Sequence, residues 1–309
     1  MVRLLHDKIA IVTGAGHGIG RGHALELAKH GAKVIVNDLG GSVDGGSSGS
    51  NRAAENVVGI IRDRGGVAIA DFGDVGDEQQ VDAMVQRAID EFGRVDILVN
   101  NAGIVRDRAV WNMSVEDFDL VMRVHVRGTW LASRAVARYW RDRAKASEGT
   151  VFGRIVNTTS GSGLHGNFGQ SNYSAAKSAI VGLTQTLSVE LASIGVTANA
   201  ISPGGRTRLS ATRPGAKPVP EADEVEDDVF DPKDPTLSCP VVAWLASEQS
   251  QYLSGQVIRA IGENIELLRG WSPEASISNG GSRWDATRLG TLIATDLYRT
   301  RAAGLRLGG

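Results

Sequence analysis

Ser160, Tyr173 and Lys177 are the residues whose types and spacing could support catalysis. Tyr173 and Lys177 are four residues apart, so on a helix they lie on one face, about 6 Å apart along the axis. An ammonium close to a phenol favours the phenolate and lowers the pKa of the tyrosine from its reference value of about 10. Tyr173 could then act as a general acid or base. The alternative is a solvated surface pair, because Tyr and Lys at this spacing are common on amphipathic helices.

Ser160 ends the apolar, β-branched run RIVNTTS, thirteen residues before Tyr173. We therefore expect it at the carboxyl end of a strand, where open α/β sheets bind their ligands. The Ser160 hydroxyl, the Tyr173 phenol and the Lys177 ammonium could converge on one substrate oxygen.

A Gly-rich turn follows the first predicted strand, KIAIVTG at 8–14, and precedes a helical pattern at 21–31. Glycine allows the sharp turn and lets a pyrophosphate approach the amides at a helix N-terminus. Such turns also serve as plain connectors, but the position between strand and helix favours a dinucleotide cradle. The predicted cradle residues are Gly14, His17, Gly18, Ile19 and Gly20.

Asp38 ends the second predicted strand, AKVIVND, about twenty residues after these glycines. A carboxylate there accepts hydrogen bonds from the ribose hydroxyls of an adenosine and repels a 2′-phosphate. The sequence therefore predicts NAD as cofactor in preference to NADP. The alternative is that Asp38 only begins the next loop, and the Gly- and Ser-rich stretch at 40–50 is typical of a surface loop.

Helix and strand patterns alternate through most of the remaining chain. Helices are predicted at 52–66, 78–93, 114–145 and 238–248, and strands at 67–74, 95–103, 196–202 and 255–261. This alternation predicts a doubly wound (Rossmann-type) α/β fold with a parallel sheet, as a single domain over 1–262. Residues 263–309 contain one amphipathic helical pattern, which we interpret as an arm packed on the main body or on a neighbouring subunit, not as an independent domain.

Composition argues against several classes of protein. The chain has 309 residues, 42% of them hydrophobic, and a formal net charge of −2. This charge gives no basic surface for nucleic acid or an anionic membrane, and no apolar run reaches the ~18 residues that span a bilayer. No N-terminal targeting segment is recognisable, so a cytoplasmic location is expected. With the single cysteine Cys239 and no H-x-x-x-H pair, we expect no metal site.

Taken together, the motifs resemble those of the short-chain dehydrogenase/reductase family over about residues 7–262. The family pattern TGxxxGIG corresponds to Gly14, Gly18 and Gly20, and Asn-Asn-Ala-Gly at 100–103 and Pro-Gly at 203–204 follow in the expected order. The resemblance implies an NAD-dependent enzyme in which Ser160, Tyr173 and Lys177 convert a secondary alcohol and a ketone into one another. Lys177 would also hold the cofactor's ribose.

The same resemblance implies further cofactor contacts. Asp74 and Val75 would meet the adenine, and the loop after the strand at 196–202 would lie against the nicotinamide. The residues implied are Asp74, Val75, Asn101, Ala102, Gly103, Pro203, Gly204 and Thr207. Several of these could equally be turn residues, and for Asn101 we expect structural support of the sheet.

His125 departs from the family pattern. Most members have an Asn in this helix, which joins the Ser, Tyr and Lys through a water and a backbone carbonyl, whereas this chain reads RVHVRG. His125 is a candidate for the same catalytic relay. The alternative is a buried histidine with satisfied hydrogen bonds.

Four phrases resemble the dehydrogenase units of type 2 peroxisomal multifunctional enzymes. They are VNDLGG at 36–41, NNAGIVRDR at 100–108, the Val-His pair before Val126, and GNFGQSNYSAAK at 166–177. This branch implies a 3-hydroxyacyl-CoA as the small-molecule substrate. A steroid or other bulky alicyclic alcohol is the alternative within the same chemistry, and a non-catalytic dinucleotide-binding sensor or scaffold is the alternative outside it. The family also implies a homodimer or homotetramer.

The segment at about 203–235 is predicted to form a substrate lid. Its first part holds four basic residues without an acid, Arg206, Arg208, Arg213 and Lys217, and 221–234 holds eight acids and one Lys. The basic run could bind the phosphates of CoA. The alternative is that it pairs with the acidic block that follows.

Overall fold

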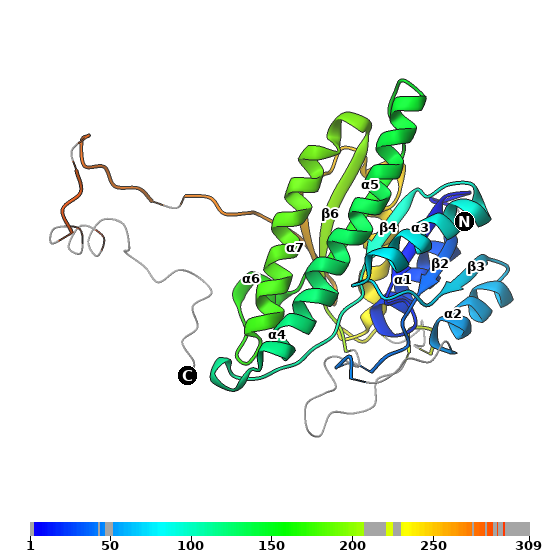
Figure 1. Cartoon of the computed structure of the whole chain (residues 1–309), viewed down its shortest axis with the longest axis horizontal. Helices are drawn as coiled ribbons and strands as arrows, with labels where there is room; N and C mark the ends of the chain where they lie inside the picture. The colour runs from blue at the N-terminus through cyan, green and yellow to red at the C-terminus, as the bar shows by residue number, and fades with distance from the viewer. Residues whose placement is uncertain are drawn as a thin grey trace. The chain divides into compact units, whose positions relative to one another are not determined.

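The fold is a parallel sheet covered by helices on both faces, in a computed structural model (Figure 1). The structure describes residues 3–42, 44–46, 52–206, 221–224, 230–273, 275–281, 283–286, 289 and 293. The chain divides into two compact units, Met1–Leu268 and Arg269–Gly309. The amphipathic pattern near the C-terminus lies almost entirely outside the described residues.

The sheet has eight strands in the order β3-β2-β1-β4-β5-β6-β7-β8. Neighbours from β3 to β7 are parallel, and the β7–β8 pair is antiparallel. The order reverses between β1 and β4, which is the point where doubly wound sheets bind their ligands. The strands are β1 Ile9–Thr13, β2 Lys33–Asn37, β3 Val67–Asp71, β4 Ile97–Asn100, β5 Gly153–Thr158, β6 Val196–Pro203, β7 Val257–Ile261 and β8 Asn264–Leu268.

The helices form two layers because alternate residues of a strand point to opposite faces. Ala10 and Val12 of β1 belong to a core cluster with α1, α2 and α8, whereas Ile9 and Ile11 belong to a second cluster with α3, α5 and α7. Figure 1 shows α5 and α7 across one face of the sheet. The helices are α1 Gly18–Lys29, α2 Arg52–Asp63, α3 Glu78–Phe92, α4 Val115–Met122, α5 Gly128–Ala146, α6 Gly161–His165, α7 Ser171–Glu190 and α8 Cys239–Leu245.

The doubly wound fold predicted from the sequence is confirmed, with three local differences. The helix predicted at 114–145 is divided by a π-helical turn, Arg123–Arg127, between α4 and α5. The short helix α6 was not predicted. The sheet also continues past residue 262, because β8 pairs with β7 where the C-terminal arm was expected to begin.

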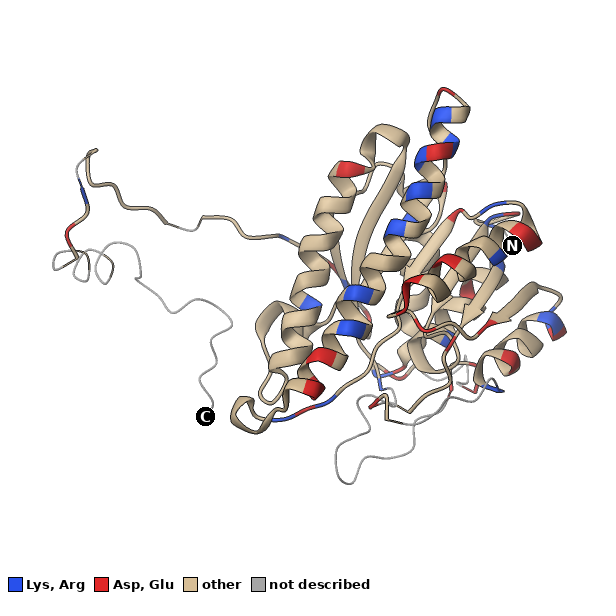
Figure 2. Ribbon diagram, in the orientation of Figure 1, with Lys and Arg blue, Asp and Glu red and all other residues tan. Residues whose placement is uncertain are grey.

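Charged residues lie mainly on the helices and loops, and β6 carries none (Figure 2). This distribution fits a sheet that is buried on both faces. None of the described helices is long and apolar enough to cross a bilayer.

His23 of α1 offers a stability test, because it is 0% exposed. Among the residues that the structure describes, neither ring nitrogen has a hydrogen-bond partner. Burial lowers the pKa of His23 from 6.5 to about 3. Between these values the unfolded chain binds a proton that the folded chain does not, so this residue makes the protein less stable as the pH falls through that window.

We expect His23→Leu to reduce the loss of unfolding free energy between about pH 7 and about pH 5, because leucine has no such proton to bind. Urea unfolding at several pH values measures this loss. His6→Leu, at an exposed position, is the matched control. Equal pH dependence in the wild type and the His23 variant would show that His23 is not buried in its neutral form.

Candidate active site

The Gly-rich turn between β1 and α1 lines a cavity of about 640 Å³. Gly14 has a φ of +62°, and a Cβ there would lie 2.7 Å from the Cα of Ala102. A Cβ on Gly20 would lie 2.1 Å from the carbonyl oxygen of Gly14. Neither position accepts a side chain, so the turn stays tight. His17, Gly18 and Ile19 line the same cavity.

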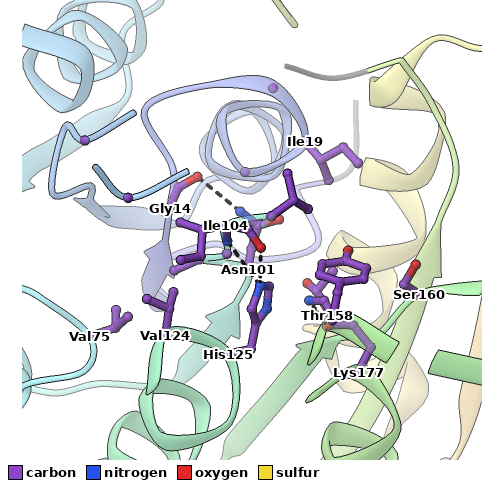
Figure 3. Close-up of a pocket in the computed structure, with 18 of the residues that line it drawn as sticks. Gly14, Ile19, Val75, Asn101, Ile104, Val124, His125, Thr158, Ser160 and Lys177 are labelled. Atoms are coloured by element: carbon purple, nitrogen blue, oxygen red, sulfur yellow. Dashed lines mark hydrogen bonds between the residues drawn. The ribbon is translucent and has the colours of Figure 1, made fainter. Parts of the chain in front are cut away.

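Asn101 braces this turn from the neighbouring strand end. Its Nδ2 donates hydrogen bonds to the carbonyl oxygens of Thr13 and Gly14, both at 3.1 Å. Figure 3 shows the bond to Gly14. These bonds tie the end of β4 to the end of β1. Ala102 and Gly103, which follow, also line the cavity.

Asp38 lies immediately after β2 and lines the cavity. Its Oδ2 accepts a hydrogen bond from the amide of Gly16 at 2.8 Å, and its Oδ1 accepts one from the amide of Gly40 at 2.7 Å. These bonds fix the carboxylate beside the Gly-rich turn. Each oxygen can accept a further hydrogen bond, so the carboxylate is placed to bind a diol.

Ser160, Tyr173 and Lys177 line the cavity together, as the sequence predicted. Ser160 follows β5 and caps α6, where its Oγ accepts the amide of Ser162 at 3.3 Å. Lys177 Nζ lies 5.6 Å from the centre of the Tyr173 ring and donates to the carbonyl oxygen of Thr158 at 2.7 Å. Figure 3 shows Ser160, Thr158 and Lys177 together at one end of the cavity.

Burial governs the protonation of both titratable groups. It lowers the pKa of Lys177 from 10.5 to about 7, so near neutral pH the amine is close to its midpoint. Burial raises the pKa of Tyr173, a hydrogen bond with Ser160 lowers it in part, and the nearby charge of Asp107 raises it further. In this structure Tyr173 is therefore a protonated phenol at neutral pH.

The expectation of a lowered Tyr173 pKa is therefore wrong, because burial raises it. A phenolate in this site loses its hydration, and that loss outweighs the attraction of a nearby amine. The amine is bonded to Thr158 and is itself only partly charged near neutral pH. Burial, which sequence spacing does not reveal, decides the direction of the shift.

His125 lies in the π-helical turn between α4 and α5 and is 1% exposed. Its Nε2 lies 2.8 Å from the carbonyl oxygen of Ile104 and 3.1 Å from the amide of Ile104. Its ring meets the Tyr173 ring edge to face, with 5.2 Å between the ring centres. A Cβ on Gly103 would lie 2.3 Å from the imidazole Cε1, so this histidine requires the glycine.

Burial, together with the charge of Lys177, lowers the pKa of His125 to about 3, although the bond with Ile104 opposes the shift. The imidazole is therefore neutral at physiological pH. Among the described residues its Nδ1 has no hydrogen-bond partner. The imidazole ring packs against Tyr173. Its Nδ1, which has no described partner, could accept a hydrogen bond in a proton relay.

Asp74 and Val75 line the cavity beyond Asp38. Asp74 Oδ2 pairs with Arg123 at 2.6 Å, and its Oδ1 accepts the amide of Gly76 at 2.8 Å. Val75 packs against α5, because a Cβ on Gly128 would lie 2.9 Å from the valine Cγ2. An apolar side chain beside an anchored carboxylate is suited to an aromatic base.

The loop after β6 is described only in part. Pro203 lines the cavity, and the amide of Gly204 donates to the carbonyl oxygen of Ala260 at 2.8 Å. Thr207 lies outside the described residues, as do Arg208, Arg213 and Lys217. Arg206 pairs with Asp231, as expected if the basic run neutralises the acidic block.

Sequence reasoning missed three features of the site. The first is the carbonyl oxygen of Thr158, which holds Lys177. The second is Gln170, whose Nε2 donates to Asp107 at 2.9 Å and whose Oε1 accepts from Ser162 at 2.8 Å. The third is Glu221, which meets the start of α1. Only Gln170 had a signal in the sequence, its place just before the helix that carries Tyr173 and Lys177.

The residues present fit a nicotinamide dinucleotide. The turn leaves no room for side chains at Gly14 and Gly20, and both residues line the cavity. At the start of α1 the Gly18 amide already binds a carboxylate oxygen at 2.8 Å, which shows that this point accepts an anion. Asp38, Tyr173 and Lys177 line the same cavity as this turn.

Comparisons with known proteins agree with this geometry. The family model described as short chain dehydrogenase matches residues 8–213. Over 298 residues the chain is 41% identical to hydroxyacyl-CoA dehydrogenase ChsB1 of Mycobacterium tuberculosis, covering 96% of this chain and 90% of that protein.

Two further comparisons extend the likeness. The chain is 39% identical over 286 residues to peroxisomal multifunctional enzyme type 2 of Mus musculus, covering 93% of this chain and 34% of the mouse protein. A crystal structure of a short chain dehydrogenase from Mycobacterium avium is similar with a TM-score of 0.82 and 41% identity, covering 96% of this chain and 97% of that one.

Proposed function

The chain belongs to the short-chain dehydrogenase family, and on this premise we propose that it is an NAD-dependent 3-hydroxyacyl-CoA dehydrogenase. The observation that carries the proposal is the meeting of Ser160, Tyr173 and Lys177 in one cavity with the Gly-rich turn. The name of the mycobacterial relative, hydroxyacyl-CoA dehydrogenase, supports the acyl-CoA substrate. The family resemblance inferred from the motifs is confirmed.

The chain's own residues would handle the proton of the reaction. In carbonyl reduction the Tyr173 phenol donates its proton to the ketone oxygen, and Ser160 donates a hydrogen bond to the same oxygen. In alcohol oxidation Tyr173 takes the hydroxyl proton instead. The nicotinamide, when bound, supplies or accepts the hydride. Lys177 stabilises the phenolate that remains after proton donation.

The cofactor would be held at both ends of the cavity. The amides at the start of α1 would bind the pyrophosphate, and Asp38 would bind the adenosine ribose. Asp74 and Val75 would border the adenine. Lys177 would bind the nicotinamide ribose through the protons not used by Thr158.

Kinetic assays with a small substrate panel test the proposed substrate class. The panel contains 3-hydroxyacyl-CoA esters, the same acyl groups on N-acetylcysteamine, and hydroxysteroids, each with NAD. We expect the highest kcat/KM with the CoA esters and a loss with the truncated thioesters, because remote contacts contribute to catalysis. A higher kcat/KM with a steroid would replace the acyl-CoA assignment while leaving the reaction type intact.

The pH profile of alcohol oxidation should report the pKa of Tyr173. Because that pKa is raised, we expect the rate to increase through the alkaline range, where the phenol becomes phenolate. Ser160→Ala should move the profile to higher pH and Asp107→Asn to lower pH, since the serine bond lowers the pKa and the aspartate charge raises it. The asparagine can still accept the Gln170 hydrogen bond. Shifts in the same direction would contradict this assignment.

Asp38 should set the choice between NAD and NADP. We expect Asp38→Ala combined with Leu39→Arg to increase kcat/KM for NADP about tenfold or more relative to NAD. The variant replaces repulsion of the 2′-phosphate by attraction. Leu39→Arg alone is the control, because Leu39 is exposed and also lines the cavity. If the double variant keeps the wild-type preference, Asp38 does not bind the ribose.

We also propose that the protein forms a homodimer or homotetramer and that it is located in the cytoplasm. Light scattering at micromolar concentration measures the assembly state. A monomer there would contradict the expected pairing of subunits.

A further inference from the structure

We propose that Glu221 is a built-in competitor of the dinucleotide, so that its carboxylate must leave the start of α1 before the cofactor's pyrophosphate can bind. The inference rests on the proposed function, because it needs a dinucleotide at this turn. The Gly-rich motif alone does not predict such competition. Part of the segment after β6 would set the affinity for the cofactor.

The contact with the helix start is direct. Glu221 Oε2 accepts a hydrogen bond from the Gly18 amide at 2.8 Å, and its Oε1 lies 2.5 Å from the Nδ1 of His17. Among the described residues the N-cap residue His17 makes no side-chain cap of its own. A carboxylate from 203 residues later in the chain therefore caps α1.

The same point is where the family binds the cofactor's pyrophosphate. His17, Gly18 and Ile19 all line the cavity that holds the catalytic residues. The first amides of a helix attract anions, and one amide hydrogen cannot serve a carboxylate and a phosphate at full strength. Glu221 and the pyrophosphate are therefore alternative ligands of this helix end.

Glu221 is charged when it makes this contact. Burial alone would raise its pKa, but the bonds from His17 and Gly18 outweigh burial and hold the pKa of Glu221 below its usual range. A carboxylate beside a phosphate repels it, and the repulsion is stronger at a partly buried site than in bulk water. Both anions cannot be accommodated together without that cost.

The segment is docked on α1 at two further points. Asp223 Oδ1 lies 2.5 Å from the Nε of Arg21 and forms an ion pair, although the two atoms are not aligned as a hydrogen bond. Both side chains are largely buried. Ala222, between the two acids, packs on the core cluster that contains α1. Three consecutive residues thus hold the segment on the helix.

Residues 221–224 also form a turn with its own internal hydrogen bonds. The amide of Glu221 donates to the Glu224 carboxylate, and the amide of Glu224 donates to the carbonyl oxygen of Glu221, both at 3.0 Å. The turn at 221–224 can therefore dock or leave as a unit. The observed cofactor affinity would equal the intrinsic affinity reduced by the fraction of molecules with the turn undocked.

NADH binding by fluorescence titration tests this directly, with Glu221→Ala and Glu221→Gln. We expect the alanine variant to bind NADH about three- to tenfold more tightly than the wild type, because the competing cap is gone. The glutamine variant should lie between them, since its amide oxygen can still accept the Gly18 hydrogen bond without carrying a charge. The ligand-free alanine variant should also unfold at a lower temperature, because α1 loses its cap.

Glu224→Gln is the matched control. It removes the same charge from the same turn, but Glu224 makes no described contact with α1, and a glutamine oxygen can still accept the Glu221 amide. We expect its NADH affinity to stay within about twofold of the wild type. An equal gain in both variants would mean that overall charge is responsible, and would overturn the specific role of Glu221.

Two other outcomes overturn the inference in distinguishable ways. Unchanged or weaker NADH binding by Glu221→Ala, with normal binding by the wild type, would show that Glu221 does not compete and would leave the proposed function standing. No NADH binding by the wild type or by any variant would remove the proposed function, and the inference with it.

Discussion

Replacing Tyr173 by phenylalanine is expected to reduce kcat by about 100- to 10,000-fold, the range that positioned general acids and bases contribute. The Tyr173 ring packs edge to face on His125, and phenylalanine can keep this contact. Only the transferable proton is removed. NADH binding should stay nearly unchanged, and steady-state kinetics with fluorescence titration measure both quantities.

Tyr252→Phe is the matched control for this substitution, because Tyr252 is exposed and does not line the cavity. It should keep wild-type kcat. Retention of more than about a tenth of the activity in the Tyr173 variant, a barrier change below about 1.4 kcal/mol, would show that another group moves the proton.

Replacing Lys177 by methionine is expected to damage both catalysis and cofactor binding. The amine bonds the carbonyl oxygen of Thr158 and has further protons for a ribose, so its removal takes away a positioned donor and a charge. We expect kcat/KM to fall about 100-fold or more and NADH to bind about tenfold more weakly. This joint effect distinguishes Lys177 from Tyr173, whose loss should spare binding.

The same variant should change how stability depends on pH. The pKa of Lys177 is about 7 in the folded chain, and its ordinary value, which the unfolded chain keeps, is 10.5. Between these values the unfolded chain holds a proton that the folded chain has released, so the free energy of unfolding rises with pH across this window. Below about pH 7 both states hold the proton, and the cost of burying the charged amine is present in full. As the pH falls from 10.5 to about 7, stability therefore decreases, and Lys177→Met should remove this decrease.

Urea unfolding at about pH 7 and about pH 9.5 measures the difference. Lys29→Met is the control, because Lys29 lies at an exposed position on α1. An unchanged pH dependence in the Lys177 variant would mean that the amine remains protonated in the folded protein.

The sheet and its helices could be predicted because their signals are local. The buried strands are short apolar runs in the sequence, and the turn glycines stand where the backbone leaves no room for a Cβ. The antiparallel strand β8 was missed because it follows β7 after only two residues and has no fully buried residue, so it lacks the buried apolar run of the central strands. The π-helical turn was missed because its residues keep an ordinary helical composition.

The meeting of Ser160, Tyr173 and Lys177 in one cavity could be predicted because Tyr173 and Lys177 share one helix and Ser160 follows a strand. The electrostatics could not, because the pKa values of Tyr173 and Lys177 depend on burial by distant segments. Contacts that join remote parts of the chain were also missed. Glu221 meets Gly18 across 203 positions, and no spacing rule connects them.

Transfer of deuterium from C3 of a labelled 3-hydroxyacyl-CoA to the nicotinamide is the most direct test of the central claim, and mass spectrometry of the reduced cofactor measures it. The proposed reaction predicts one deuterium per NADH formed, with one equivalent of 3-oxoacyl-CoA. It also predicts that Tyr173→Phe forms labelled cofactor about 100- to 10,000-fold more slowly than the wild type. Formation of 3-oxoacyl-CoA with unlabelled NADH, or no turnover of the CoA ester under conditions where NAD binds, would contradict it.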